Sequence, residues 1–256
     1  MLVPTQWIVY VVPGLLIASR LSGLLITMPF LGADTIAPRI KAALVIALTL
    51  LMLPVVPLAL PRQGPLDWFG YGLTELTIGA FMGLAVRVIF EAVQLAGDVA
   101  SFQLGLSLET SIDPSSGASS TVLATLHYLV VLYVFLQLGV HRWILLALLS
   151  SFRTLPLGSS LGAPSLHALL TFAGSLWVWG VELALPILIA TFLIDVTMAF
   201  FAKSAPQLPV IFFGIPITEL VGYGVLMAAM RFWPGILAGH FQQALQFLAQ
   251  HAHPGS

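Results

Sequence analysis

Long stretches without a charged side chain are the feature that most constrains the fold of this 256-residue chain. Only 7% of its residues are charged, against roughly 25% in an average soluble domain. Asp, Glu, Lys and Arg are absent or nearly absent from the segments 2–19, 42–61, 114–141, 154–181, 183–194 and 210–230. A transmembrane helix needs about 20 mostly apolar residues, whereas β-barrel strands alternate apolar and polar residues over about ten. The sequence therefore predicts an all-α integral membrane protein.

The apolar stretches predict about seven long helices. We expect these helices near 5–29, 38–60, 68–104, 118–138, 141–152, 166–201 and 210–231. Prolines stand within the apolar stretches at Pro13, Pro54, Pro57, Pro186, Pro206, Pro209 and Pro216. A proline frees backbone groups that must find partners in neighbouring helices or in a water-filled cavity. The prolines therefore favour broken helices in an oligomeric assembly, with ordinary tolerated kinks as the alternative.

An amphipathic helix is predicted near the C-terminus, over residues 236–250. Its apolar positions recur at helical spacing, at Leu237, Phe241, Leu245 and Leu248. We therefore expect a single membrane domain over residues 1–235, followed by an amphipathic helix and tail over residues 236–256. This helix fits either a position at the membrane interface or docking on a partner subunit.

The third predicted helix carries a face of small and polar residues that does not suit contact with lipid. Nine residues fall within an arc of roughly 120° on a helical wheel: Gly72, Gly79, Gly83, Arg87, Glu91, Gln94, Asp98, Ser101 and Gly105. Gly79 and Gly83 form a small-xxx-small pair, which lets another backbone approach closely. Arg87 and Glu91 can pair across one helical turn, whereas Asp98 needs a partner or water. The pattern predicts a subunit-packing face; a solvated helix end outside the bilayer is the alternative.

The least apolar segment of the chain is residues 105–121, GLSLETSIDPSSGASST. Asp-Pro followed by Ser-Ser-Gly is typical of turns, because the residue before proline leaves the helical region and glycine permits positive φ. The segment is longer than the usual helix connection of about two to eight residues. We predict a functional loop, such as a lid, plug or filter, rather than a simple connector. Its candidate residues are Gly105, Leu106, Ser107, Glu109, Asp113, Pro114, Ser115, Ser116 and Gly117.

The sequence offers no catalytic or metal-binding motif. It has no cysteine and no HExxH, Walker A or GxSxG motif, and its histidines lie in the tail or too far apart for a local metal site. A net charge of −1 gives no basic patch for nucleic acid. We therefore expect no enzymatic activity, no cofactor and no metal. Glu182 and Asp195 lie in apolar surroundings, and with Gln207 they are the other buried polar residues for which we expect a functional or inter-subunit role.

Several motifs, in order along the chain, resemble those of one known family. The run from Gly79 through LAVRVIFEAVQLAGDVASFQLGLSLETSIDPSSG is similar to the central signature of the FliR/SctT family of export-gate proteins. Further similar landmarks are Arg20, Gly23, the run from Pro29 to Arg39, Gly139–His141, Ser151–Phe152, Leu155–Gly158, Asp195 and Ala205–Gln207. The landmarks around His141 and Ser151 resemble the flagellar branch. Pro209 and Thr74 depart from the family pattern, where Asn is usual and where Arg often precedes Glu75, respectively.

The resemblance implies a non-enzymatic subunit of a type III secretion export gate in the bacterial inner membrane, at the flagellar basal body. Such a subunit combines FliP-like and FliQ-like helical elements. It forms with FliP and FliQ a pore for unfolded flagellar proteins, and it engages FlhB. By the same resemblance, the loop at 105–117 lies where the family places a plug across the closed pore.

Two alternatives remain for the function. The first is an injectisome export-gate subunit of the SctT type. The second is a small secondary transporter, in which Asp98, Glu182 or Asp195 would bind solute and coupling ion near the membrane midplane. A transporter would be stable alone or as a homo-oligomer, whereas a gate subunit would need heterologous partners.

Overall fold

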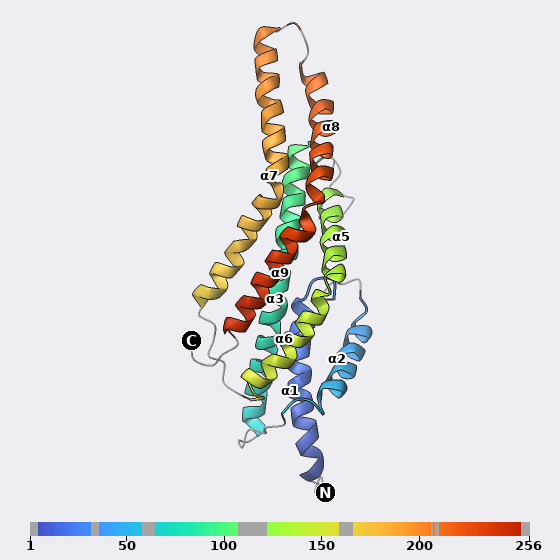
Figure 1. The fold of residues 1–256 in the computed structure, drawn as a ribbon. Helices are drawn as coiled ribbons and strands as arrows, with labels where there is room; N and C mark the ends of the chain where they lie inside the picture. Colours follow the sequence, from blue (N-terminus) through green and yellow to red (C-terminus); the bar gives the residue numbers. More distant parts are fainter. Residues whose placement is uncertain are drawn as a thin grey trace. The chain divides into compact units, whose positions relative to one another are not determined.

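The computed structural model describes residues 5–31, 36–57, 65–106, 122–158, 166–205, 207 and 210–251 (Figure 1). Its helices in chain order are α1 (Thr5–Thr27), α2 (Pro38–Met52), α3 (Pro65–Gln103), α5 (Val122–Gln137), α6 (Val140–Thr154), α7 (Leu166–Ser204), α8 (Val210–Met230) and α9 (Trp233–His251). No strand occurs within these described ranges. The prediction of an all-α fold is confirmed.

Within the described part of the chain, four helices are long and apolar enough to cross a membrane. The candidate spans are Tyr10–Thr27, Trp68–Gln103, Leu170–Ser204 and Phe213–Met230. Helices α5 and α6 qualify as a fifth span only together, and they meet at a bend of 64°. The bend lies at Gly139, whose φ of 67° is in the left-handed region that glycine adopts without strain. This number of apolar helices agrees with a membrane protein.

The prolines act differently from one helix to the next. Pro13, Pro186 and Pro216 lie inside α1, α7 and α8, and none of them ends its helix. Helix α2, in contrast, ends at Met52 rather than near residue 60 as expected. The Leu53 N–H still donates to the Thr49 carbonyl, but Pro54 comes next and has no N–H with which to continue the helical hydrogen bonds. The chain therefore turns over residues 53–56.

The helices are distributed over two compact units. The first unit comprises Met1–Val88, Gly139–Ala173 and Phe241–Ser256, and the second comprises Ile89–Leu138 and Gly174–His240. Helices α3, α7 and α9 each contribute one part to each unit. The single domain over residues 1–235 with a separate tail stays a prediction.

In the first unit, α1 and α3 lie side by side and run parallel (Figure 1). Gly23 of α1 contacts the backbone of Leu76, and Gly83 of α3 contacts the backbone of Met28. The residue numbers rise together along the two helices, which defines the parallel direction. A Cβ atom at Gly23 would overlap the carbonyl oxygen of Leu76, so the absence of a side chain is what permits this close approach. Helix α2 packs against α1.

In the second unit, the later part of α3 packs against α5. Gly97 lies against the backbone of Ala124, where a Cβ atom would be only 2.6 Å from the Ala124 Cα. Phe90 makes edge-to-face contacts with Tyr128 and Phe135, with ring centroids 5.8 and 5.7 Å apart. Aromatic pairs in this geometry add to the stabilisation from burial.

Helix α9 is amphipathic, and its apolar face packs within the chain. The face is buried at Leu237, Phe241, Ala244 and Leu248. Phe247 stacks on Phe172 with ring centroids 4.3 Å apart and an interplanar angle of 11°. Side chains of the same chain cover these residues, and a position of the helix at the membrane interface or on a partner subunit stays a prediction.

Candidate functional site

A buried ion pair joins α1 to α3 in the first unit. Arg20 Nε donates to Glu75 Oε2 at 2.5 Å, and neither side chain is exposed. Each residue lies within a candidate span of its helix. A charge at membrane depth is costly unless an opposite charge and hydrogen bonds compensate it. The pairing therefore offsets much of the cost of placing these two charges among apolar helices.

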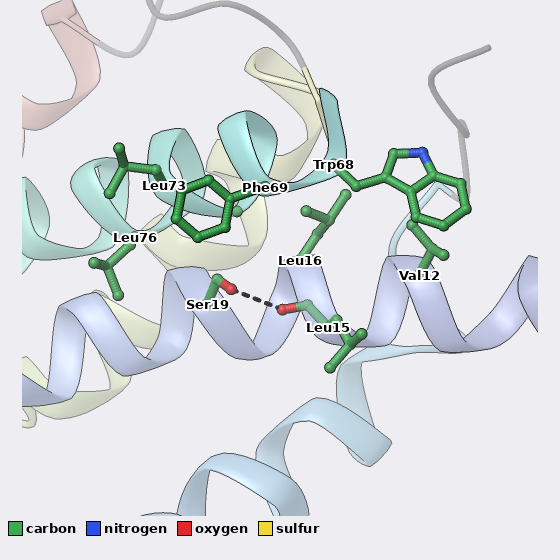
Figure 2. A pocket seen from close by; sticks show the side chains of 9 residues that line it. Val12, Leu15, Leu16, Ser19, Trp68, Phe69, Leu73 and Leu76 are labelled. Atoms are coloured by element: carbon green, nitrogen blue, oxygen red, sulfur yellow. Dashed lines mark hydrogen bonds between the residues drawn. The ribbon is translucent and has the colours of Figure 1, made fainter. Parts of the chain in front are cut away.

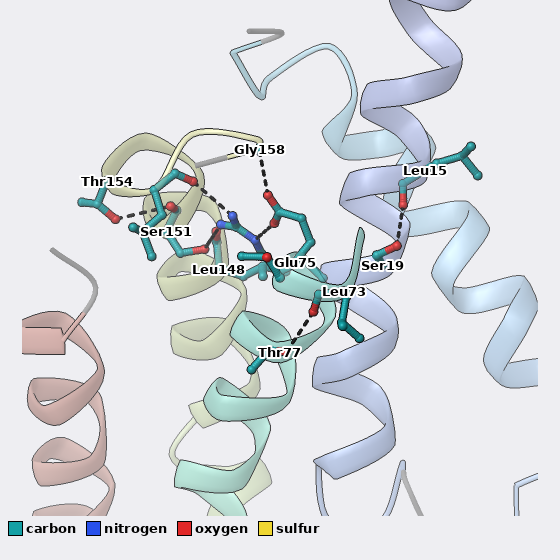
Figure 3. Close-up of polar contacts among 12 residues, drawn as sticks. Leu15, Ser19, Leu73, Glu75, Thr77, Leu148, Ser151, Thr154 and Gly158 are labelled. Atoms are coloured by element: carbon teal, nitrogen blue, oxygen red, sulfur yellow. Dashed lines mark hydrogen bonds and ion pairs between the residues drawn. The ribbon is translucent and has the colours of Figure 1, made fainter. Parts of the chain in front are cut away.

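The end of α6 supplies the other groups around the guanidinium. Arg20 Nη1 donates to Ser151 Oγ at 2.9 Å, and Nη2 donates to the carbonyl oxygen of Leu155 at 3.1 Å. The Arg20 Cζ atom lies 4.1 Å from the centroid of the Phe152 ring, a cation–π distance. The Ser151 hydroxyl in turn donates to the carbonyl oxygen of Leu148 at 2.7 Å, so its lone pairs are left to accept from Arg20 (Figure 3).

The turn that follows α6 binds the second carboxylate oxygen of Glu75. The Gly158 N–H donates to Glu75 Oε1 at 3.1 Å, as Figure 3 shows. Gly158 has a φ of 77°, which glycine adopts without strain and other residues rarely do. Both oxygens of the carboxylate are thereby hydrogen-bonded. We call this set the Arg20–Glu75 network; its members are Arg20, Glu75, Ser151, Phe152, Leu155 and Gly158.

The Arg20–Glu75 network is suited to fixing the structure rather than to binding a substrate. Its ion pair is sealed from solvent, and its charged groups are held by protein atoms. Removing one partner of a buried pair typically costs about 3–5 kcal/mol, because the other charge is left uncompensated. The network therefore holds α1, α3 and the end of α6 in one arrangement. Across the described part of the chain, no three His, Asp or Glu side chains are placed to hold a metal ion.

A second polar cluster lies in the second unit, between α7 and α9. His240 Nε2 lies 3.4 Å from Glu182 Oε2, and the imidazole stacks on the Trp179 ring with centroids 4.6 Å apart. Burial lowers the pKa of His240, and the nearby Glu182 carboxylate opposes this shift by favouring the charged imidazole. The imidazole is therefore mainly neutral near pH 7.

The predicted packing face of α3 is partly used within the chain itself. Gly79 and Gly83 are buried against α1, and a Cβ atom at Gly79 would overlap the carbonyl oxygen of Arg20. The backbone that approaches these two glycines thus belongs to the same chain. Of the other members of the face, Ser101 is buried, Gly72, Glu91 and Gln94 are half-buried, and Arg87 and Asp98 are exposed. Contact of the exposed members with another subunit stays a prediction.

The predicted plug loop begins at the C-terminal end of α3, where a capping motif ends the helix. The Leu106 N–H donates to the Ser101 carbonyl at 3.0 Å, and the Gly105 N–H donates to the Phe102 carbonyl at 3.1 Å. With Gly105 at a φ of 75°, these two bonds form a Schellman motif that ends the helix. The other candidate residues lie outside the described residues, and their role stays a prediction: Ser107, Glu109, Asp113, Pro114, Ser115, Ser116 and Gly117.

The three other predicted polar residues lie on the surface of this chain. The side chain of Glu182 is 49% exposed, and Asp195 and Gln207 are exposed. Asp195 lies within the candidate span of α7. The chain alone buries none of the three, and their burial by a partner subunit stays a prediction.

The Arg20–Glu75 network is not predicted as a site from the sequence. In the sequence, three of its parts stand out only as motifs of the family resemblance: Arg20, Ser151–Phe152 and Leu155–Gly158. One signal could have found the pair: Arg20 and Glu75 are charges in apolar helices, and neither has an opposite charge three or four residues away. Two such charges of opposite sign are natural candidates to be each other's partners.

Comparison with known proteins relates the chain to bacterial export proteins. The sequence model of the family described as bacterial export proteins, family 1, matches residues 11–244. The flagellar biosynthetic protein FliR of Escherichia coli (strain K12) is 31% identical over 215 residues, which cover 82% of this chain and 81% of that protein. FliR of Pectobacterium carotovorum subsp. carotovorum is 30% identical over 234 residues, covering 90% and 88% of the two chains. FliR of Aquifex aeolicus (strain VF5) is 26% identical over 231 residues, 87% of each chain.

Proposed function

The chain belongs to family 1 of the bacterial export proteins, the family of the flagellar biosynthetic protein FliR, and on this basis we propose that it is a non-enzymatic subunit of the flagellar type III export gate. In this proposal it builds, with FliP and FliQ, the pore through which unfolded flagellar proteins cross the bacterial inner membrane. It also engages FlhB. The flagellar assignment, rather than the injectisome one, is supported by the relatives, which are flagellar biosynthetic proteins.

The exposed surfaces of α7 and α8 carry the proposal of a hetero-oligomeric gate. Only 22% of an 18-residue apolar stretch within the span Leu170–Ser204, and 11% of the residues in Phe213–Met230, are buried. Asp195 is exposed in the first span, and Glu219 is only half-buried in the second. Hydrocarbon can neither hydrate nor pair a carboxylate, so these faces require neighbouring protein or a water-filled passage. A subunit of a pore complex has both.

The loop at 105–117 is proposed as the plug of this pore. Its short polar side chains can form a compact stopper, and Pro114 and Gly117 favour turns without the need for a helix. Its start is fixed by the helix end at Gly105. A plug anchored to a rigid helix end can be displaced without disturbing the helices.

Co-expression with FliP and FliQ of the same bacterium tests the proposed function. We expect the tagged chain to elute with both proteins as one complex in mild detergent. Asp195→Leu should reduce the amount of partner recovered, whereas Val196→Leu, a change at the adjacent exposed position, should not. Deleting the gene should abolish filament assembly and motility, and a plasmid copy should restore both.

One set of results would overturn the proposed function. The chain would purify as a stable homo-oligomer without retaining FliP or FliQ, and the deletion strain would export flagellar proteins and swim normally. Binding of a small solute by that homo-oligomer would identify a secondary transporter instead.

A further inference from the structure

We propose that Gly222 of α8 is a positioning residue. Through its contact with Leu104, α8 sets the position of the C-terminal end of α3 and of Gly105 and Leu106, with which the loop at 105–117 begins. For what this loop does, the inference rests on the proposed function. The residues that carry the inference all lie in the second unit.

Helix α8 buries little of its surface against the rest of the chain. Within the span Phe213–Met230 only Gly222 and Leu226 are buried, and they lie one helical turn apart on the same face. Large apolar side chains point away from this face, and among them Leu220 and Met227 are 76% and 70% exposed. A neighbour that packs on the exposed side of α8 therefore acts on this chain mainly through Gly222 and Leu226.

The contact at Gly222 is made by the residue that caps α3, Leu104. The atoms nearest to a Cβ position at Gly222 belong to the Leu104 side chain, and a Cβ atom there would overlap its Cδ2. Leu104 is only 2% exposed, so in a close-packed interior its side chain has little room to move aside. The absence of a side chain at 222 is thus what lets α8 approach this end of α3 closely.

The position of Leu104 also determines how α3 ends. Its N–H donates to the Ala100 carbonyl at 3.0 Å, and the N–H groups of Gly105 and Leu106 make the two hydrogen bonds of the Schellman motif. These three bonds hold residues 104–106 on the last turn of α3. A displacement of Leu104 therefore loosens the motif from which the loop at 105–117 leaves the helix. The contact couples the exposed helix α8 to the start of that loop.

Alanine substitutions at three glycines form a matched set for the test. Gly222→Ala places a methyl group against Leu104. Gly224→Ala adds the same group to the same helix two residues later, where nothing lies within 4 Å of a Cβ position. Gly72→Ala adds it in a groove between α1 and α3, where only Ser19 Oγ lies within 4 Å, at an ordinary 3.8 Å (Figure 2). The double variant Gly222→Ala, Leu104→Val shortens the opposing side chain and should restore the fit.

The experiment uses the full chain in complex with FliP and FliQ of the same bacterium. Hydrogen–deuterium exchange, resolved to single residues by mass spectrometry, measures the protection of the Gly105 and Leu106 amides. We expect both amides to exchange about ten-fold faster in Gly222→Ala, which corresponds to the lower part of the range that overpacking typically costs. In Gly224→Ala, Gly72→Ala and the double variant, both should exchange as in the wild type.

A second readout separates positioning from a loss of stability. Conductance is measured in planar bilayers on complexes that assemble in normal yield. Gly222→Ala should make the complex conduct ions, whereas Gly224→Ala and the double variant should leave it closed. Deletion of residues 111–119, which removes the proposed plug, is the reference for an open pore.

Two results would overturn the inference: unchanged exchange at Gly105 and Leu106 in Gly222→Ala, or fast exchange that Leu104→Val does not reverse. If Gly222→Ala does not assemble, recovery of assembly in the double variant supports the contact, and failure to recover overturns it. A conducting deletion variant beside a closed Gly222→Ala complex would also overturn the inference while the proposed plug stands. A closed deletion variant beside fast, reversible exchange in Gly222→Ala would contradict the plug alone and support the positioning of the helix end.

Discussion

Arg20 donates hydrogen bonds to three separate segments of the chain, at Glu75 on α3, Ser151 on α6 and Leu155 in the turn that follows. A planar guanidinium suits this task, because its donors point in fixed and different directions while its face rests on the Phe152 ring. A lysine ammonium is a compact point charge that cannot reproduce this fork. The residue therefore acts as a positioning group whose geometry matters as much as its charge.

Breaking the Arg20–Glu75 pair from one side should be more damaging than removing both charges. Glu75→Leu leaves a buried guanidinium unpaired, at a cost of about 3–5 kcal/mol. The double variant Arg20→Met, Glu75→Leu has no buried charge and should recover part of this loss. The measurement is the thermal unfolding midpoint of the purified protein in detergent. Arg153→Met, which removes an exposed arginine of α6, is the control and should change little; a double variant as unstable as the sum of its single changes would contradict the prediction.

Acid should weaken the contact between α7 and α9 through His240. Burial holds the folded-state pKa of His240 below its unfolded value of about 6.5. The unfolded chain thus binds more protons between these two values, so this stabilisation is complete above about pH 6.5 and is lost as the pH falls toward the folded pKa.

The unfolding midpoint of wild type and His240→Phe, measured from pH 7.5 to 5.5, tests this dependence. Phenylalanine keeps a ring against Trp179 and cannot be protonated, so this variant should lose less stability at low pH. Glu182→Gln removes the carboxylate that favours the charged imidazole, and should deepen the loss. Identical pH profiles for all three proteins would show that His240 is not the group responsible.

At the scale of helices, the existence of each element could be predicted because long charge-free windows and their flanking turns are local features. The sequence predicts a helix over 68–104, and α3 runs from Pro65 to Gln103; it predicts a helix over 141–152, and α6 runs from Val140 to Thr154. The wheel also places Gly79 and Gly83 together. It cannot show that α1 covers them, because the identity of a packing neighbour is decided by the tertiary fold and not by helical period.

The same limit explains why the Arg20–Glu75 network escapes sequence analysis. Its ion pair joins residues 55 positions apart, and its bonds to Ser151 and Leu155 join residues 131 and 135 positions apart. Helical spacing relates only residues three or four apart. The pairing of Arg87 with Glu91 could be considered from the sequence, whereas the pairing of Arg20 with Glu75 required the parallel packing of α1 and α3.

The close packing of α1 on α3 should be sensitive to a single methyl group. Gly79→Ala places a Cβ atom onto the carbonyl oxygen of Arg20, and should destabilise the first unit by about 1–3 kcal/mol, as overpacking typically does. Gly70→Ala is the control on the same helix. It meets nothing within 4 Å and should stabilise by up to about 1 kcal/mol through helix propensity. Unfolding midpoints that shift in the same direction would contradict the packing at Gly79.

At the scale of the whole molecule, the chain leaves polar groups on helices apolar enough to span a membrane. The roles of Glu182, Asp195 and Gln207 could not be derived from their sequence surroundings, since their exposure depends on what else is present in an assembly. The sequence locates the carboxylates within apolar helices. It does not specify which neighbouring protein groups or water molecules contact these carboxylates.

Removing the proposed plug should separate pore closure from assembly. Deletion of residues 111–119 should leave complex formation with FliP and FliQ intact and make the membrane conduct ions. Moving a closed state from 99:1 to 1:99 requires about 5.5 kcal/mol, so a displaceable plug is held by modest contacts that its deletion removes entirely. Conductance in planar bilayers measures the effect, with deletion of residues 252–256 as the control. A complex that assembles and stays as tight as wild type would assign closure to another segment.

Because the members of the Arg20–Glu75 network are far apart in the sequence, the ribosome synthesises them at different times. At roughly 5–20 residues per second, the ribosome adds Glu75 about 3–11 seconds after Arg20. Ser151 follows Arg20 by 131 residues, about 7–26 seconds later at the same rates. Throughout that delay the nascent α1 carries a guanidinium without its native partners, at a cost of roughly 2.5–3.5 kcal/mol near the bilayer centre. Helix α1 therefore reaches its full set of native contacts only after α3 and α6 have been synthesised.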